Sequence, residues 1–271
     1  MQDTLTLPVD SVYISDKSLK SKDTYDIINS NISFVNALFS EYLEQDELCP
    51  QALISYYTDY YLAQLENGGC SQFVYNSRWD KVMIDLVKTG LSVMRAEKHL
   101  ALFLKLEALV EEMKGGQLER FFSSEYFGDN EERDNFGPLD DELDTIYEEE
   151  DLVSLNAAWL KSLPNLKVLS IKEMEKAVDA YGKLVPDREA RIAKSLENEP
   201  EYAKTIRYLC SQTGMELDRI TAGDPSHTYN GVETLAWHFL TDQGHYYFIE
   251  LDDTVRLFDD DDHEVFFELR K

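Results

Sequence analysis

The sequence predicts an α+β protein, with a mainly helical N-terminal domain followed by a smaller domain that contains an antiparallel β-meander. Apolar residues recur at helical spacing through most of residues 1–185. From Gly231 onward the pattern changes to short aromatic and β-branched runs separated by turn-forming Asp and Gly. We therefore expect a helical domain over 1–185 and a small α+β domain over 186–271, with Val185-Pro186 at the boundary.

Two helical segments lead to a glycine pair. Helical spacing is clear over 28–42 and again over 53–65, where paired tyrosines occupy apolar positions. Asn67-Gly68-Gly69 follows, and glycine adopts positive φ at little cost. We expect the tyrosine helix to stop and turn there, although a peptide- or ligand-binding loop is the alternative. The residues assigned to this structural motif are Asn67, Gly68, Gly69, Gln72, Phe73, Tyr75 and Asn76.

Capping signals divide the rest of the helical domain. Ser77 with Asp80 resembles a helix start, and Gly90 is expected to end or bend that helix. The segment 91–114 is apolar on more than one face, which predicts a central buried helix closed by glycines 115 and 116. Ser170 with Glu173 resembles a second capping box, with a stop at residue 182. Residues 201–210 are expected to form a helix before the meander.

The charge is unusually acidic and unevenly distributed. Fifty-three acids against 26 bases give a net charge of −27. Residues 129–151 contribute −11 and residues 242–268 contribute −9, so two short blocks carry −20 of the total. Such a surface should be repelled by nucleic acid and by anionic membranes. Basic proteins or cations are the expected partners.

The first acidic block predicts a helix over 139–149. Asp140, Asp144 and Glu148 stand at i, i+4 and i+8, opposite an apolar stripe, so they form a row of negative charges spaced about 6 Å apart. DNA carries about one charge per 1.7 Å, so one row is too sparse to imitate it and several acidic surfaces must combine. A merely solvated face is the alternative. The predicted partner-binding residues are Asp140, Asp141, Asp144, Glu148, Glu149, Asp259, Asp260 and Asp261.

Signals for chemistry are weak. His238 and His245 flank a predicted hairpin and are candidates, with Asp242 or Asp252, for a metal site, but their spacing fits no zinc signature. The run 259–262 lacks the alternating ligands of a calcium loop and fits a solvated turn better. Phosphate loops, serine elbows and Cys-His pairs are missing from the sequence. We expect no enzyme, no cofactor and no metal.

Location is inferred from the same composition. Three widely spaced cysteines suit neither a disulfide framework nor a zinc site. The N-terminus shows no secretory signal, and no apolar run approaches the length of a membrane span. A reducing, cytoplasmic location is the expectation.

Two stretches carry a resemblance to a known family. "YYLAQLENGGCSQFVYNS" and "LDDELDTIYEEEDLVSLNAAWLKSLPNL" resemble the acidic DNA-mimic protein family, whose shared helical domain was long catalogued as a domain of unknown function. The likeness covers roughly residues 41–169. It implies a helical, acidic, non-enzymatic protein that imitates DNA and occupies a DNA-binding transcription regulator. Nothing after about residue 185 belongs to the resemblance.

The leading functional expectation is therefore a DNA mimic that occupies the DNA-binding surface of a basic protein such as a transcription regulator. An immunity-type protein that neutralises a basic toxin or nuclease is the first alternative. A metal-dependent protein using the C-terminal histidines and aspartates is the second.

Overall fold

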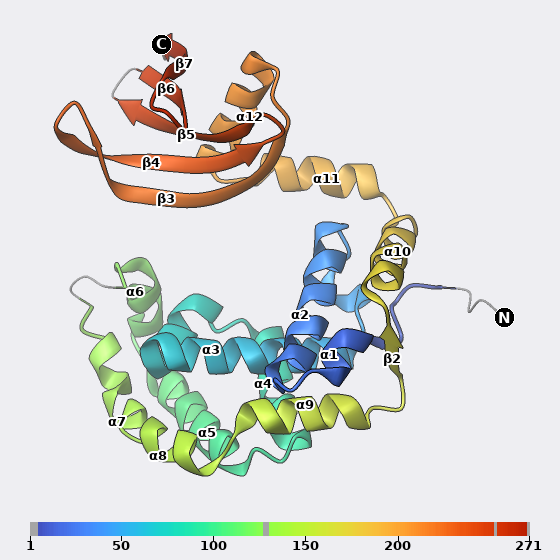
Figure 1. Ribbon diagram of the computed structural model, residues 1–271. Coiled ribbons are helices and arrows are strands. Elements are labelled where there is room, and N and C mark those ends of the chain that lie inside the picture. Colours follow the sequence, from blue (N-terminus) through green and yellow to red (C-terminus); the bar gives the residue numbers. More distant parts are fainter. Residues whose placement is uncertain (1–4, 127–129, 252–253, 270–271) are drawn as a thin grey trace. The chain divides into compact units, whose positions relative to one another are not determined.

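The computed structural model describes residues 5–126, 130–251 and 254–269. The chain forms two compact units, Met1–Pro186 and Asp187–Lys271. The first is mainly helical, and the second combines helices with an antiparallel sheet (Figure 1). This confirms the predicted α+β class.

The first unit is built on a long helix crossed by shorter ones (Figure 1). In chain order its elements are β1 (Val12–Ser15), α1 (Asp16–Lys20), α2 (Tyr25–Ser40), η1 (Gln45–Glu47), α3 (Pro50–Ser77), α4 (Lys81–Val93), α5 (Glu97–Glu112), α6 (Gln117–Ser123), η2 (Arg133–Phe136), α7 (Gly137–Asp140), α8 (Leu143–Glu149), α9 (Leu152–Ser162), β2 (Leu166–Leu169) and α10 (Ile171–Gly182).

Helix α3 contributes to both hydrophobic cores of this unit. Its second half packs with α4, α5, α7 and α8, and the Tyr61 ring lies edge-on to Phe73 and Phe103 at centroid distances of 5.1 and 5.6 Å. Its first half packs with β1, α2, α9 and α10. Rings in such edge-to-face contacts add about 0.5–1.5 kcal/mol beyond their buried area. The tyrosine-rich sequence of α3 is therefore explained by packing on both sides.

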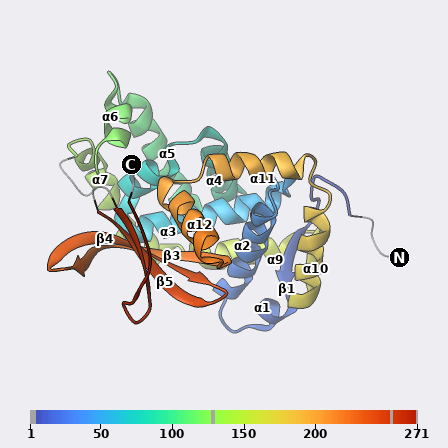
Figure 2. The same cartoon turned by 90° about the horizontal axis from the view of Figure 1, so that it is seen from above.

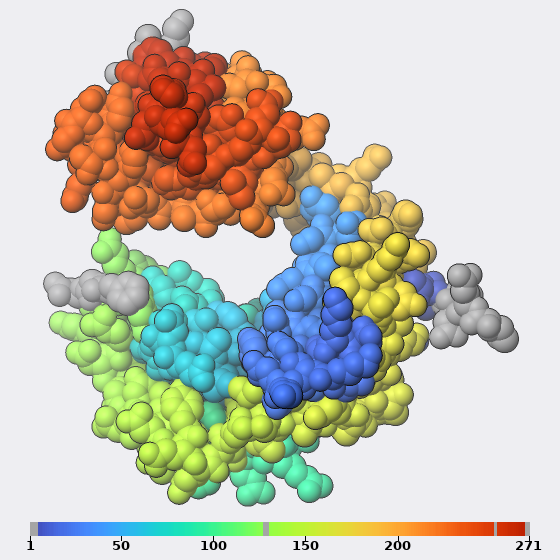
Figure 3. All heavy atoms as spheres, in the orientation of Figure 1, coloured from blue at the N-terminus to red at the C-terminus, as the bar shows by residue number. Residues whose placement is uncertain are grey.

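A short parallel strand pair in the helical unit was not predicted. Strand β1 pairs with β2, from Val12↔Leu166 to Ser15↔Leu169. Four-residue strands give little local signal, and their pairing partner lies about 150 residues away in the chain. Segments distant in sequence also meet where α2 packs against α10 (Figure 3).

Two predictions about the middle of the unit are wrong. Gly90 neither ends nor bends its helix: α4 continues to Val93, and a Cβ at Gly90 would lie 2.1 Å from the Thr58 Oγ1 atom of α3. Glycine here permits a close helix crossing. The expected single helix over 91–114 is two helices, because Arg95 has φ of +60° and interrupts the chain between α4 and α5.

Other capping predictions can be compared directly with the structure. Ser170 and Glu173 form the predicted capping box, in which Ser170 N donates to Glu173 Oε2 at 2.9 Å. Asp80, by contrast, is itself the N-cap of α4 and accepts from Met83 N at 3.0 Å. Ser77 is the last residue of α3 and starts no helix.

The second unit is a five-stranded antiparallel meander with helices beside it. Its elements are α11 (Arg188–Glu197), α12 (Glu201–Thr213), β3 (Leu217–Tyr229), β4 (Val232–Thr241), β5 (Gly244–Leu251), β6 (Thr254–Asp259) and β7 (Glu264–Leu269), with strand order β3-β4-β5-β6-β7.

Helix α12 covers one face of this sheet (Figure 2). Ile206 and Leu209 of α12 pack against Phe239 and Phe248 of the sheet. The meander was expected from Gly231, but β3 already begins at Leu217. The sequence of β3 did not indicate a strand, because glycine and proline interrupt the alternation of apolar and polar residues that is typical of strands.

Candidate acidic partner-binding surface

The glycine pair forms a kink at which the two helical segments of α3 meet. Gly68 has φ of −164° and Gly69 has φ of +74°, and helical geometry resumes at Cys70 and continues to Ser77. The prediction that the tyrosine helix stops and turns at this pair is confirmed, and a second helical segment begins directly after it. The kink frees backbone N–H groups in the middle of α3, and these need new acceptors.

Asp140 supplies one of these acceptors. Its Oδ1 atom accepts a hydrogen bond from Cys70 N at 2.7 Å, although the two residues are 70 positions apart. A Cβ built on Gly69 would lie 2.5 Å from the same oxygen. The glycine thus provides both the positive φ and the room for the carboxylate. Burial raises the pKa of Asp140, and the Cys70 N–H opposes this effect.

The remaining motif residues make contacts that fix the kinked helix. Gln72 Nε2 and Asn76 Nδ2 both donate to Gln64 Oε1, at 3.1 and 2.6 Å. Tyr75 Oη donates to the Ser124 carbonyl at 2.8 Å, and Phe73 is fully buried. Asn67 is exposed on the surface. The side chains after the glycines are thus engaged within the fold.

The predicted acidic helix is divided into α7 and α8. Glu142, between them, pairs with Lys105 of α5 at 2.6 Å, and Glu149 pairs with Lys98 of the same helix. These lysines neutralise part of the acidic block. The prediction of a straight row from Asp140 to Glu148 is wrong. Asp140 accepts a hydrogen bond at the kink of α3, whereas α8 is paired with α5 through Glu149 and Lys98.

Two further acids in this block cap helices. Both Oε atoms of Glu150 accept from Lys98 N at 3.1 Å, and Oε2 also accepts from His99 N at 2.9 Å, at the start of α5. Asp151 is the N-cap of α9 and accepts from Ser154 N at 2.9 Å. Carboxylates at helix N-termini are stabilised by backbone N–H groups and by the helix dipole.

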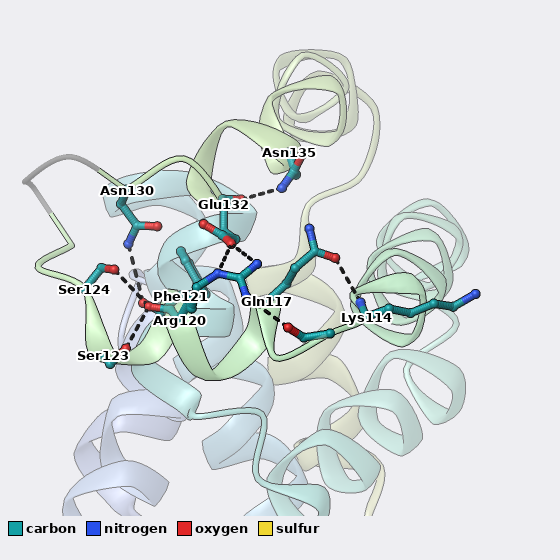
Figure 4. Close-up of polar contacts among 10 residues, drawn as sticks. Lys114, Gln117, Arg120, Phe121, Ser123, Ser124, Asn130, Glu132 and Asn135 are labelled. Atoms are coloured by element: carbon teal, nitrogen blue, oxygen red, sulfur yellow. Dashed lines mark hydrogen bonds and ion pairs between the residues drawn. The ribbon is translucent and has the colours of Figure 1, made fainter.

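Arg120 neutralises another acid of this block, Glu132 (Figure 4). Its guanidinium contacts Glu132 Oε1 through Nε at 3.0 Å and through Nη2 at 2.9 Å, while Nη1 donates to the Gly115 carbonyl at 3.0 Å. Asn130 Nδ2 donates to the Phe121 carbonyl in the same region. Much of the acidic excess between residues 129 and 151 therefore stabilises the fold.

Four other acids lie on α8, just before it or on α3, and we call them the α8 surface: Glu66, Asp141, Asp144 and Glu148. All four are exposed, and none forms an ion pair with another residue in the described part of the chain. Burial raises the pKa of Tyr147, and the charges of Glu66, Asp140 and Asp144 add to this rise. Sequence reasoning missed Glu66, whose only signal is its position beside the Asn-Gly-Gly kink.

Residues 259–261 belong to the β6–β7 turn of the second unit. Asp259 accepts from Asp261 N at 3.0 Å and from His263 N at 2.9 Å, and these bonds lower its pKa. Asp260 Oδ1 contacts His245 Nδ1 at 2.6 Å. Asp261 has an exposed side chain. The first two carboxylates therefore have structural partners.

The predicted grouping of histidines with Asp242 is wrong. Asp242 Oδ1 accepts from Glu216 N at 2.7 Å and holds a turn. His238 and His245 do meet, with His238 Nδ1 and His245 Nε2 3.2 Å apart. Asp252, the other acid considered, lies outside the described residues. The three cysteines, Cys49, Cys70 and Cys210, are buried and free.

Asp59 is a second residue that the sequence did not single out. It lies on α3, two turns before Glu66, and accepts from Tyr25 Oη at 3.4 Å. Burial raises its pKa to about 6, the tyrosine hydrogen bond opposes the rise, and the charge of Glu66 adds to it. In a run of tyrosines a single aspartate gives no indication of its burial.

Comparison with known proteins gives one match. The sequence model of the family described as DMP19-like protein matches residues 46–163, from η1 through the end of α9. No curated protein and no solved structure matches the chain. Among the described helices, none has the length and apolar character needed to cross a membrane. The matched segment contains the α3 kink, its Asp140 cap and the α8 surface, and over these residues the chain is similar to DMP19-like protein.

Proposed function

We propose that this chain is a non-enzymatic, cytoplasmic DNA mimic whose α8 surface occupies the DNA-binding surface of a basic protein such as a transcription regulator. The observation that carries the proposal is the coincidence of family match and uncompensated charge. The acids within residues 46–163 are of two kinds. Some form ion pairs or cap helices, and others are exposed to solvent without an ion pair among the described residues. Only the second kind is available to a partner.

The α8 surface combines charges from more than one element, as imitation of DNA requires. Asp144 and Glu148 lie one turn apart on α8, Asp141 precedes that helix, and Glu66 adds a charge from α3. Charge at this density is still lower than that of DNA. Recognition therefore depends on the summed field and on several exposed contacts, each worth a fraction of a kcal/mol to about 1 kcal/mol.

Neutralising the α8 surface should weaken partner binding at least about tenfold. The test variant combines Asp141→Asn, Asp144→Asn and Glu148→Gln, and it leaves Asp140 and the paired acids intact. The partner is the protein that the full chain captures from a native lysate. Titration calorimetry at 50 and 150 mM salt then measures the affinity of this partner for the wild-type chain and for the variant. Wild-type binding should weaken as the salt concentration rises, because the electrostatic screening length falls to about 8 Å at 150 mM.

A matched control removes the same number of charges elsewhere. Asp46→Asn, Glu175→Gln and Asp179→Asn change exposed acids of η1 and α10, which also belong to the first unit. This variant should retain wild-type affinity to within about twofold if a defined surface is responsible. Equal losses in both variants would indicate a net-charge effect, and no loss in either would mean that the α8 surface is only solvated.

A further inference from the structure

The second unit gathers three of the five histidines of the chain on the sheet face opposite α12. His238 of β4 and His245 of β5 alternate with the residues that face α12, and His227 of β3 joins them. His227 and His238 have ring centroids 6.5 Å apart, and His238 and His245 stack at 5.3 Å with planes 7° apart. In the described part of the chain, donor atoms of Asp224, His227 and His238 lie within 4.8 Å of one another.

A β-bulge produces this grouping. Asp224 pairs with Ala236 and His227 pairs with Thr234, so three steps along β3 correspond to two steps along β4. In a regular strand, residues three apart face opposite sides. The extra residue in the bulge turns Asp224 and His227 to the same side, and Pro225 is tolerated there because β3 is an edge strand. Bulges commonly re-aim side chains in this way.

Hydrogen bonding fixes which nitrogen of His238 is free. Asp260 as a carboxylate only accepts, so His245 Nδ1 carries a proton and donates to it at 2.6 Å. In the neutral ring, His245 Nε2 is then an acceptor, and His238 Nδ1 must donate to it across 3.2 Å. The remaining nitrogen, Nε2 of His238, keeps its lone pair. A carboxylate that orients a histidine from behind is the usual outer-shell arrangement of metal-ligating imidazoles.

Asp224 likewise retains a ligand atom. Its Oδ1 accepts from Ser226 N at 2.9 Å, which orients the carboxylate within the bulge and leaves Oδ2 without a hydrogen-bond partner among the described residues. All three residues are partly exposed, so the side chains can rotate. A tetrahedral zinc site places its donors roughly 3.3 Å apart. Small rotations of the three side chains would bring them to that separation.

We propose that Asp224, His227 and His238 bind one divalent transition-metal ion, with His245 and Asp260 positioning His238. Two imidazoles and one carboxylate suit zinc and related ions, whereas calcium and magnesium prefer sets made of oxygen ligands. The bound ion fastens the edge strand β3 to β4 and stabilises the bulge. It has no part in the recognition assigned to the α8 surface, which belongs to the other unit.

Titration of the full chain with Zn²⁺ tests this proposal. Calorimetry at 150 mM salt with 1 mM Mg²⁺, which occupies weak acidic sites, should show one Zn²⁺ per chain. Asp224→Asn keeps the oxygen that Ser226 N requires but removes the charge, and it should weaken binding at least tenfold. His227→Ala should do the same, and His245→Gln should weaken binding about 10- to 100-fold through the outer shell. His263→Gln changes an exposed histidine outside the cluster and should leave the affinity unchanged.

A second readout separates a built site from acidic surface binding. Co²⁺ in a site with imidazole ligands should give the visible absorption of a low-symmetry complex, and this signal should disappear in the Asp224→Asn and His227→Ala variants. Circular dichroism of each variant before metal is added confirms that it is folded. Zinc binding that is unchanged in these variants, has several weak equivalents or equals that of His263→Gln overturns the proposal, as does the absence of binding.

Discussion

Replacing Gly69 with valine should lower the free energy of unfolding by about 2–4 kcal/mol. The residue has φ of +74° and ψ of −168°, a region that essentially only glycine adopts, and a side chain there costs about 1–3 kcal/mol. Its Cβ would also lie 2.5 Å from Asp140 Oδ1, so the capping carboxylate must leave Cys70 N, and loss of a cap costs about 1 kcal/mol. Urea unfolding followed by circular dichroism measures the change.

Two companion variants separate backbone strain from loss of the cap. Gly115→Val meets nothing within 4 Å and has φ of +64°, so it should carry the backbone cost alone. Asp140→Ala should cost about 1 kcal/mol. The Gly69→Val and Asp140→Ala double variant should be less destabilised than the sum, by about the value of the cap. Additive losses would show that Gly69 and Asp140 do not interact.

Asp59→Asn should stabilise the protein at pH 7.5 by up to about 3 kcal/mol and by almost nothing near pH 4. The folded-state pKa is raised to about 6, above the value of 3.8 for an ordinary aspartate, because the carboxyl is largely buried. Between these values the unfolded chain releases the proton while the folded chain retains it. The wild type therefore loses stability as pH rises from about 4 to 6, and the neutral amide avoids this loss.

The measurement is the difference in unfolding free energy between wild type and variant at several pH values, since the other titrating groups largely cancel in the difference. Glu66→Gln removes a charge that contributes to the raised pKa of Asp59. It should give a smaller gain in the same direction. A difference between wild type and Asp59→Asn that is constant from pH 4 to 7.5 would show that the Asp59 carboxyl is solvated.

Local signals in the sequence predicted much of the helical unit and the meander. The helical spacing around the tyrosines, the Ser170–Glu173 box and the turn residues between aromatic strands all act over a few positions. Contacts between distant segments gave no such signal. The β1–β2 pair, the Gly90 crossing on Thr58 and the bulge at Asp224 depend on partners that only the fold brings together.

The acidic block shows the same distinction at the candidate site. Periodicity placed Asp140 in one row with Asp144 and Glu148, but the helix is divided and Asp140 caps α3. Spacing along a helix cannot reveal that a carboxylate meets a free N–H group 70 residues away. Nor does a count of acids distinguish Glu149, which is paired with Lys98, from Glu148, which has no ion pair among the described residues.

Competition with DNA tests the central claim most directly. The full chain is immobilised, loaded with its captured partner from a nuclease-treated lysate, and washed with duplex DNA that the partner binds or with polyglutamate of equal total charge. If the α8 surface occupies the DNA-binding surface, the duplex should release the partner at concentrations near its own affinity, and polyglutamate should release far less. A stable ternary complex of chain, partner and DNA would contradict the proposal.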